Sequence, residues 1–180
     1  MNGTGGSPAS MMGKSPIAAV ALFCLAMTAA TVVQAQQRQA EVAARGAEIM
    51  PFDLKASSHV FTRRGDGGLQ QVLLRNPGDT VQLRLIRRHL REIATRFEQG
   101  DFSAPTQIHG ENMPGLALLK LAKPGEIAIH YRDLSNGAQI RYATSNPALV
   151  QALHQWFDAQ LQDHGADARA GHGHHGAHRR

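Results

Sequence analysis

The sequence predicts an α+β domain in which helices cover one face of a four-stranded antiparallel sheet. Two pairs of β-prone runs, 58–64 with 69–75 and 127–132 with 139–144, are each joined by a turn containing glycine, as in hairpins. An Asn-Pro pair follows each hairpin and opens a stretch with apolar residues at helical spacing. Since each hairpin has one apolar face and each helix one apolar stripe, two packed layers are expected.

The two halves of the sequence resemble each other. Gly68 aligns with Gly137 and Gln70 with Gln139, although the Asn-Pro pairs are then one residue out of step. This pattern is consistent with a duplicated strand-strand-helix unit, but turn residues of this kind also recur by chance.

The N-terminal segment is typical of an export signal. Lys14 precedes an apolar run from 17 to 30, and Val33-Gln34-Ala35 fits a cleavage site. A membrane anchor is the alternative, but the run is shorter than the roughly 20 residues that a span needs. The sequence therefore predicts a periplasmic or secreted protein that begins near Gln36, lacks the single cysteine, Cys24, and makes no membrane contact after cleavage.

Composition divides the chain into four parts. A signal peptide (1–35) is followed by a linker or frayed helix (36–52), a single domain (53–165) and a disordered histidine-rich tail (166–180).

Charge and motifs exclude several function classes. Lys14 is the only one of 19 basic residues within 1–35, which holds none of the 14 acidic residues, so the mature chain carries a net charge of +4. The arginines are dispersed, which argues against nucleic acid as a partner. The sequence has no hydrolase elbow, P-loop or His-Glu-x-x-His motif, so no motif indicates an enzyme. Asp158 and Asp163 are interpreted as part of a solvated helix face.

A loop from 107 to 115, bounded by glycine and proline, is the first candidate site. His109 and Met113 offer an imidazole and a thioether, ligands that suit copper, and His59 or His164 could supply a third ligand. In the competing interpretation Met113 fills the edge of the core and His109 caps the next helix.

The other histidines differ in what they predict. The tail histidines form a second candidate site for copper, zinc or nickel, or else belong to a solubilising tail: His172, His174, His175 and His178. His89 is expected to pack in the core, and His130 to face the other side of the sheet. His154 and His164 lie too far apart along one helix to share a metal ion.

Three runs carry a resemblance to a known group: 50–55, 108–116 and 153–165. They resemble small exported bacterial proteins that bear the label aspartate carbamoyltransferase. Enzymes of that family use a Ser-Thr-Arg-Thr phosphate-binding motif, which this sequence lacks. The resemblance therefore implies export but no transfer chemistry.

Two function classes follow. The first is an exported protein that binds a transition metal, copper above all, through histidine and methionine. The second is a scaffold that binds an unidentified protein partner through the polar face of its sheet, with His130 and Arg132.

Overall fold

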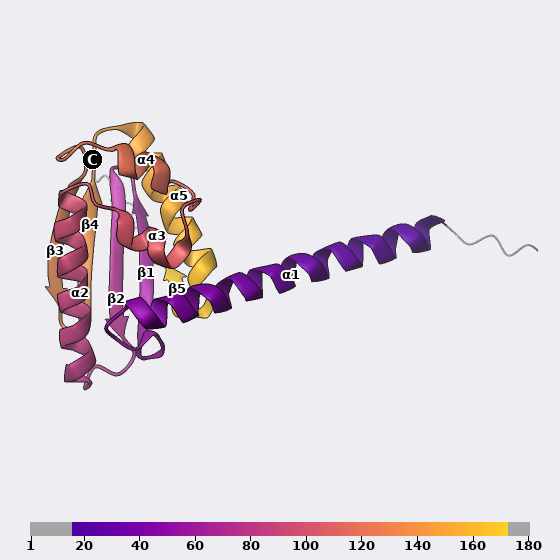
Figure 1. The fold of residues 1–180 in the computed structure, drawn as a ribbon, viewed down its shortest axis with the longest axis horizontal. Helices are drawn as coiled ribbons and strands as arrows, with labels where there is room; N and C mark the ends of the chain where they lie inside the picture. The colour runs from indigo at the N-terminus through magenta and orange to yellow at the C-terminus, as the bar shows by residue number, and fades with distance from the viewer. Residues whose placement is uncertain (1–15, 173–180) are drawn as a thin grey trace, which may run out of the picture. The chain divides into compact units, whose positions relative to one another are not determined.

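The computed structural model describes residues 16–172 and has an α+β fold with five α-helices and a five-stranded mixed sheet (Figure 1). The helices are α1 (Pro16–Ile49), α2 (Thr80–Glu98), α3 (Ser103–His109), α4 (Leu116–Leu121) and α5 (Pro147–His164). The strands are β1 (Ser57–Arg64), β2 (Gly67–Leu74), β3 (Ala128–Leu134), β4 (Gly137–Ala143) and β5 (Ala168–Ala170). The chain divides into two units, 1–36 and 37–180, and the sheet and its covering helices belong to the second.

The prediction of a four-stranded antiparallel sheet was wrong in one respect, because a fifth strand runs parallel to β1. The strand order is β3-β4-β2-β1-β5, with Ala168 opposite His59. The N–H of Gly171 donates to the Phe61 carbonyl at 2.8 Å, which continues the pairing. Backbone pairing with a free sheet edge requires no apolar side chain, so composition assigned residues 166–171 wrongly to a disordered tail. Residues 173–180 lie outside the described residues.

Both hairpins turn through two residues, 65–66 and 135–136, and their registers correct the alignment of the halves. An offset of 70 residues superimposes both the turns and the Asn-Pro pairs. The ends of the central strands β2 and β4 also match: the N–H of Leu74 donates to Asn136 O at 2.8 Å, and that of Thr144 to Asp66 O at 2.9 Å. These two bonds exchange partners under the same offset, as in a two-fold arrangement.

The helix that follows each hairpin packs on the other hairpin, and both helices lie on the same face of the sheet (Figure 1). From α2, Arg87 donates to the backbone oxygens of Leu134 (2.5 Å) and Gly137 (3.3 Å) at the second turn.

His154 of α5 makes the corresponding contact with the first turn. Its Nε2 lies 3.0 Å from Arg64 O and 2.9 Å from Gly67 O, the positions 70 residues before those that Arg87 holds. Each helix thus fixes the turn of the other half, which supports the duplicated strand-strand-helix unit on structural grounds.

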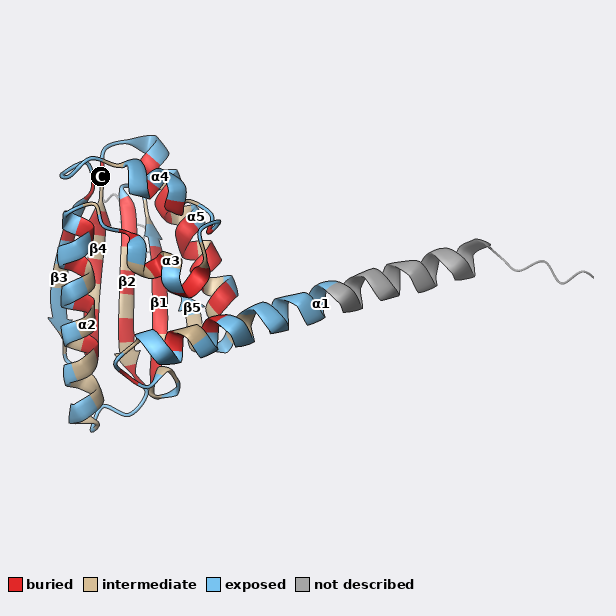
Figure 2. Cartoon of the chain, in the orientation of Figure 1, coloured by how far each residue is buried: buried red, intermediate tan, exposed pale blue. Residues whose placement is uncertain are grey.

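The core lies between the sheet and the helices α2 and α5 (Figure 2). Aromatic rings dominate its centre, where Trp156 packs edge-on to Tyr142 at 5.6 Å and to Phe97 at 5.9 Å. Most of the apolar positions of these two helices are buried or partly buried, and Leu90 and Leu153 are fully so, whereas Val81 in the first turn of α2 is exposed.

The two Asn-Pro pairs have different roles. Asn146 is the N-cap of α5, with Pro147 at the first turn as predicted. Asn76 instead forms a turn, in which its side-chain oxygen accepts the Gly78 N–H. The helix α2 begins at Thr80, three residues after Pro77, and its N-cap is Asp79, whose carboxylate accepts the Gln82 N–H. Asn and Asp are about equally good N-caps, so the residue type alone did not distinguish the two positions.

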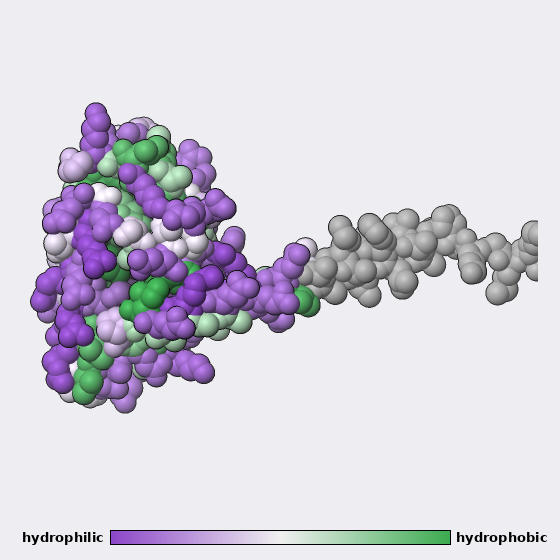
Figure 3. All heavy atoms as spheres, in the orientation of Figure 1, coloured by the Kyte–Doolittle hydropathy of each residue, from purple (hydrophilic) through white to green (hydrophobic). Residues whose placement is uncertain are grey.

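The segment from 37 to 49 is the last part of α1, and Val42 within it is buried. Of the two interpretations of this segment, linker or helix, the structure has the helix. No helix in the part of the chain that the structure describes is long and apolar enough to cross a membrane. The surface of the second unit in Figure 3 is largely hydrophilic, with small hydrophobic patches.

Candidate functional site: a cavity lined by four histidines

Four histidines from four different elements line one small cavity. His59 comes from β1, His89 from α2, His109 from the end of α3 and His164 from the end of α5. The cavity has a volume of about 40 Å³, and its remaining walls are mostly apolar.

Three of these imidazoles lie against one another. The rings of His59 and His164 are stacked, with centroids 4.7 Å apart and planes at 10°. His109 meets His164 edge-on at 5.1 Å and 74°. His89 stands apart, since its ring packs on Phe52, which separately contacts His59. The structure therefore brings His109 together with both of the residues that the sequence offered as a third ligand.

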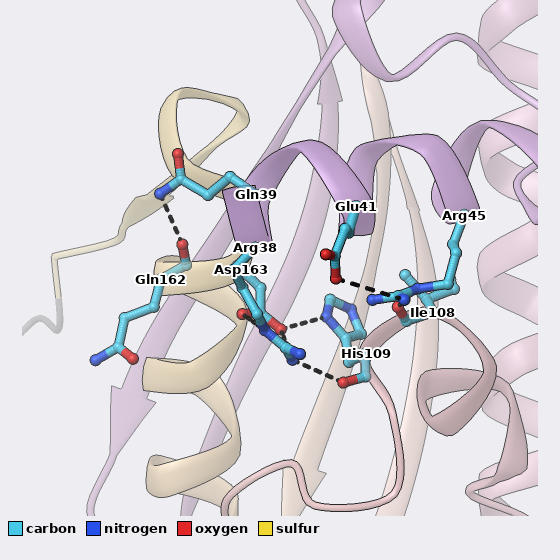
Figure 4. A network of polar contacts seen from close by, with 8 residues as sticks. All are labelled: Arg38, Gln39, Glu41, Arg45, Ile108, His109, Gln162 and Asp163. Atoms are coloured by element: carbon cyan, nitrogen blue, oxygen red, sulfur yellow. Dashed lines mark hydrogen bonds and ion pairs between the residues drawn. The ribbon is translucent and has the colours of Figure 1, made fainter. Parts of the chain in front are cut away.

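Asp163 and Arg38 fix the orientation of the His109 ring (Figure 4). The His109 Nδ1 lies 2.8 Å from Oδ2 of Asp163. Because a carboxylate only accepts hydrogen bonds, Nδ1 carries a hydrogen, and Nε2 is therefore the nitrogen that has the lone pair when the ring is neutral. Arg38 pairs with both carboxylate oxygens at 2.8 Å and also donates to the His109 carbonyl at 2.7 Å.

Asp163 is ionised in this setting. Burial opposes its ionisation, but the hydrogen bonds from His109 and Arg38 outweigh burial and lower the pKa of the carboxyl to about 2. Only 7% of the residue is exposed, so the interpretation of Asp163 as part of a solvated helix face was wrong. Its polar sequence neighbours conceal that the helix end turns this position inward.

Two arginines of α1 hold the last turn of α3. Arg38 binds the His109 carbonyl, and Arg45 donates to the Ile108 carbonyl at 2.6 Å. These carbonyls have no partner within the helix, so the two guanidinium groups satisfy them. Sequence reasoning missed Arg38 because it lies in a segment of Ala, Gln and Glu without a motif.

The cavity wall holds two buried polar atoms that have no hydrogen-bond partner among the described residues, Nδ1 of His59 and Nε1 of Trp156. The His59 ring forms a hydrogen bond with the backbone of Asp167. Since Nδ1 is unpaired, this bond involves Nε2, and Nδ1 is the nitrogen with a free lone pair. An unpaired buried nitrogen costs free energy, which favours an occupant in the cavity. The volume exceeds the roughly 10–15 Å³ that one water needs.

Burial favours the neutral form of three of these histidines, His59, His89 and His164. It lowers the pKa of His59 to about 4, and the charge that His89 or His109 would carry when protonated acts in the same direction. Burial also lowers the pKa of His89 to about 4 and that of His164 well below its ordinary value. Metal ions bind only the neutral ring, so the lone pairs are available at neutral pH.

The remaining candidates lie elsewhere. Met113 is buried in the hydrophobic core and does not line the cavity, and His109 ends α3 instead of capping the next helix. His130 is exposed on the face of the sheet away from the helices. His172 is exposed, and His174, His175 and His178 lie outside the described residues.

The ring nitrogens of the cavity histidines do not surround a common point. Within residues 16–172, no three His, Cys, Asp or Glu side chains are arranged to hold a metal ion. The rings of His59 and His164 are stacked, and because ring lone pairs lie in the ring plane, two nearly parallel rings do not direct their lone pairs to one point. Rotation of one ring about χ2, a torsion with a broad energy profile, would bring the planes together.

Comparison of the chain with protein-family models, curated proteins and solved structures found no match. The chemistry of the cavity is therefore the main guide to function.

Proposed function

We propose that the second unit binds one copper ion in this cavity, through His59, His109 and His164. The observation that carries the proposal is the meeting of the His59, His109 and His164 rings at one cavity. Burial favours the neutral, metal-binding form of His59 and His164. Imidazole nitrogen is a good ligand for copper, zinc and nickel.

The Asp163–His109 pair adds support. Histidines that bind metals commonly donate their other ring N–H to a carboxylate, which fixes the tautomer and makes the coordinating nitrogen more basic. His109 makes this contact through Nδ1, which leaves Nε2 as the coordinating atom.

The fit of the remaining residues points the same way. The free Nδ1 of His59 would gain a partner on coordination, which removes the cost of leaving it unpaired. Met113 takes no part in this proposal, because it packs in the core. Ordered water is the competing occupant, and it would leave the cavity without metal affinity.

The test uses the full chain with its tail histidines changed to serine, called here the tail-substituted protein: His172→Ser, His174→Ser, His175→Ser and His178→Ser. These changes preserve β5 and remove the competing tail ligands. Calorimetric titration with copper ions should show one equivalent bound. His109→Ala should abolish this binding, because it removes both a ligand and the partner of Asp163.

His130→Ala is the matched control, because this histidine is exposed on the opposite side of the sheet. It should leave the stoichiometry at one and the affinity unchanged. If the tail-substituted protein binds no copper, or if His130→Ala weakens binding as much as His109→Ala, the cavity is not a copper site.

We also propose that the protein acts after export to the periplasm, on the basis of its N-terminal segment. Cleavage after Ala35 would leave Arg38, which holds Asp163 and His109, as the third residue of the mature chain. N-terminal sequencing of protein recovered from the periplasm should read Gln36 first. Recovery of the uncleaved chain in the membrane fraction would contradict export.

A further inference from the structure

We infer that the cavity selects its ion by charge and holds Cu(I) in preference to divalent ions, with Arg38 as the residue that sets this preference. The inference rests on the proposed metal site and specifies the oxidation state of its ion. Two independent features of the structure carry it, the charge balance around the cavity and the number of donors in its wall.

The charge balance is close to zero. Among the described residues, no Asp or Glu lines the cavity, and the carboxylate of Asp163 is linked to it through His109. Arg38 pairs with both oxygens of that carboxylate at 2.8 Å, and the Asp163 side chain is only 9% exposed. The guanidinium thus offsets the negative charge of the carboxylate that is hydrogen-bonded to His109.

A neutral, buried site penalises a divalent ion more than a monovalent one. The cost of moving an ion out of water rises with the square of its charge, so a dication that keeps its full charge loses about four times as much as a monocation of similar size. Protein sites for divalent ions usually offset this loss with a carboxylate, a thiolate or bound water. Here the carboxylate is already neutralised by Arg38.

The donor set gives the second argument. Three imidazoles meet in the cavity, whereas zinc in structural sites takes four protein ligands. The Trp156 N–H is a donor and cannot coordinate, and Gln70 Oε1 already accepts the Tyr142 hydroxyl at 2.7 Å. Gln160 adds only a hard amide oxygen, which suits Cu(I) poorly, whereas Met50, which also lines the cavity, carries a soft thioether. A soft ion that accepts two or three nitrogens fits this wall best.

The test compares two ions on the tail-substituted protein. Cu(I), added without oxygen and in competition with a chromophoric chelator, should bind at least roughly a hundredfold more tightly than Zn(II). Arg38→Gln should then raise the Zn(II)-to-Cu(I) affinity ratio by about tenfold or more. Without the guanidinium, the charge of Asp163 is unbalanced, and it attracts a divalent ion about twice as strongly as a monovalent one. If Arg38 only supported α3, both affinities would fall together and the ratio would not change.

Arg45→Gln is the matched control. This residue also donates to an α3 carbonyl from α1, but its ion pair is with the exposed Glu41 and not with Asp163, so the ratio should stay at its wild-type value. Should Arg38→Gln fail to fold, Asp163→Asn provides the opposite change, since it leaves Arg38 unbalanced and should lower the ratio.

The outcomes separate the two proposals. If neither ion binds, the metal site itself is contradicted. Binding of Zn(II) as tightly as Cu(I), or a ratio that Arg38→Gln leaves unchanged, would overturn the inference about charge and leave the metal site standing.

Discussion

Lowering the pH from 7 to 4.5 is expected to reduce the free energy of unfolding of the metal-free protein by roughly 4 kcal/mol. The folded state holds the pKa of His59 and of His89 at about 4, below the ordinary value of 6.5. Between pH 4 and pH 6.5, these histidines bind protons in the unfolded chain but not in the folded one. The stability that the neutral rings supply is therefore full above pH 6.5 and is lost as the pH falls toward 4.

The magnitude follows from the depth of the pKa shift. At pH 4.5, two pH units below the ordinary value, a histidine as deeply buried as His59 contributes about 2–3 kcal/mol of the loss. His89 is only half-buried and contributes somewhat less. His164 adds to the loss in the same direction.

Urea unfolding at a series of pH values, in the presence of a metal chelator, measures this effect. His59→Leu removes one titrating ring while filling its space, so the curve of stability against pH should become shallower between 6.5 and 4.5. His130→Leu, at an exposed position, should leave the slope unchanged. A stability that stays flat across this interval in the wild-type protein would show that the buried rings accept protons without penalty.

The fold was largely predictable because its elements depend on local patterns. Two-residue turns and helical apolar spacing are short-range signals, and they located both hairpins and the helices α2 and α5. The strand β5 and the helix α3 were not predicted. Ala168–Ala170 has no strand pattern of its own and depends on the free edge of β1, while α3 contains Pro105 and reads as a loop.

The site was predictable in part. Three of its histidines were candidate ligands from the sequence: His109 for its place in a loop bounded by glycine and proline, and His59 and His164 as possible third ligands. Their partners were not found, since an ion pair between Arg38 and Asp163 spans 125 residues and leaves no local pattern. Met113 was paired with His109 because both lie in one short loop and offer ligands that suit copper, but Met113 packs in the core. Gly110, between them, has φ +86°, a backbone conformation that the sequence alone does not reveal.

Gly115→Ala is expected to be among the most destabilising single substitutions in the chain, with a loss of roughly 4 kcal/mol or more. Gly115 is the N-cap of α4 and has φ +77°, a conformation that costs an L-residue about 1–2 kcal/mol. An added Cβ would lie 2.1 Å from the Ala152 carbonyl oxygen and 3.0 Å from the Trp156 backbone nitrogen. Both atoms belong to the backbone of α5, so relief requires moving the helix that carries His164.

Gly100→Ala separates the two contributions to this loss. Gly100 has nearly the same φ, +79°, but the nearest atom to its added Cβ is 3.8 Å away, so only the conformational cost of about 1–2 kcal/mol should appear. Trp156 is the only tryptophan and lies in the core, so its fluorescence reports the urea unfolding of both variants. If the two substitutions cost the same, α4 shifts freely against α5, and the packing that positions the end of α5 beside the cavity is looser than its contacts indicate.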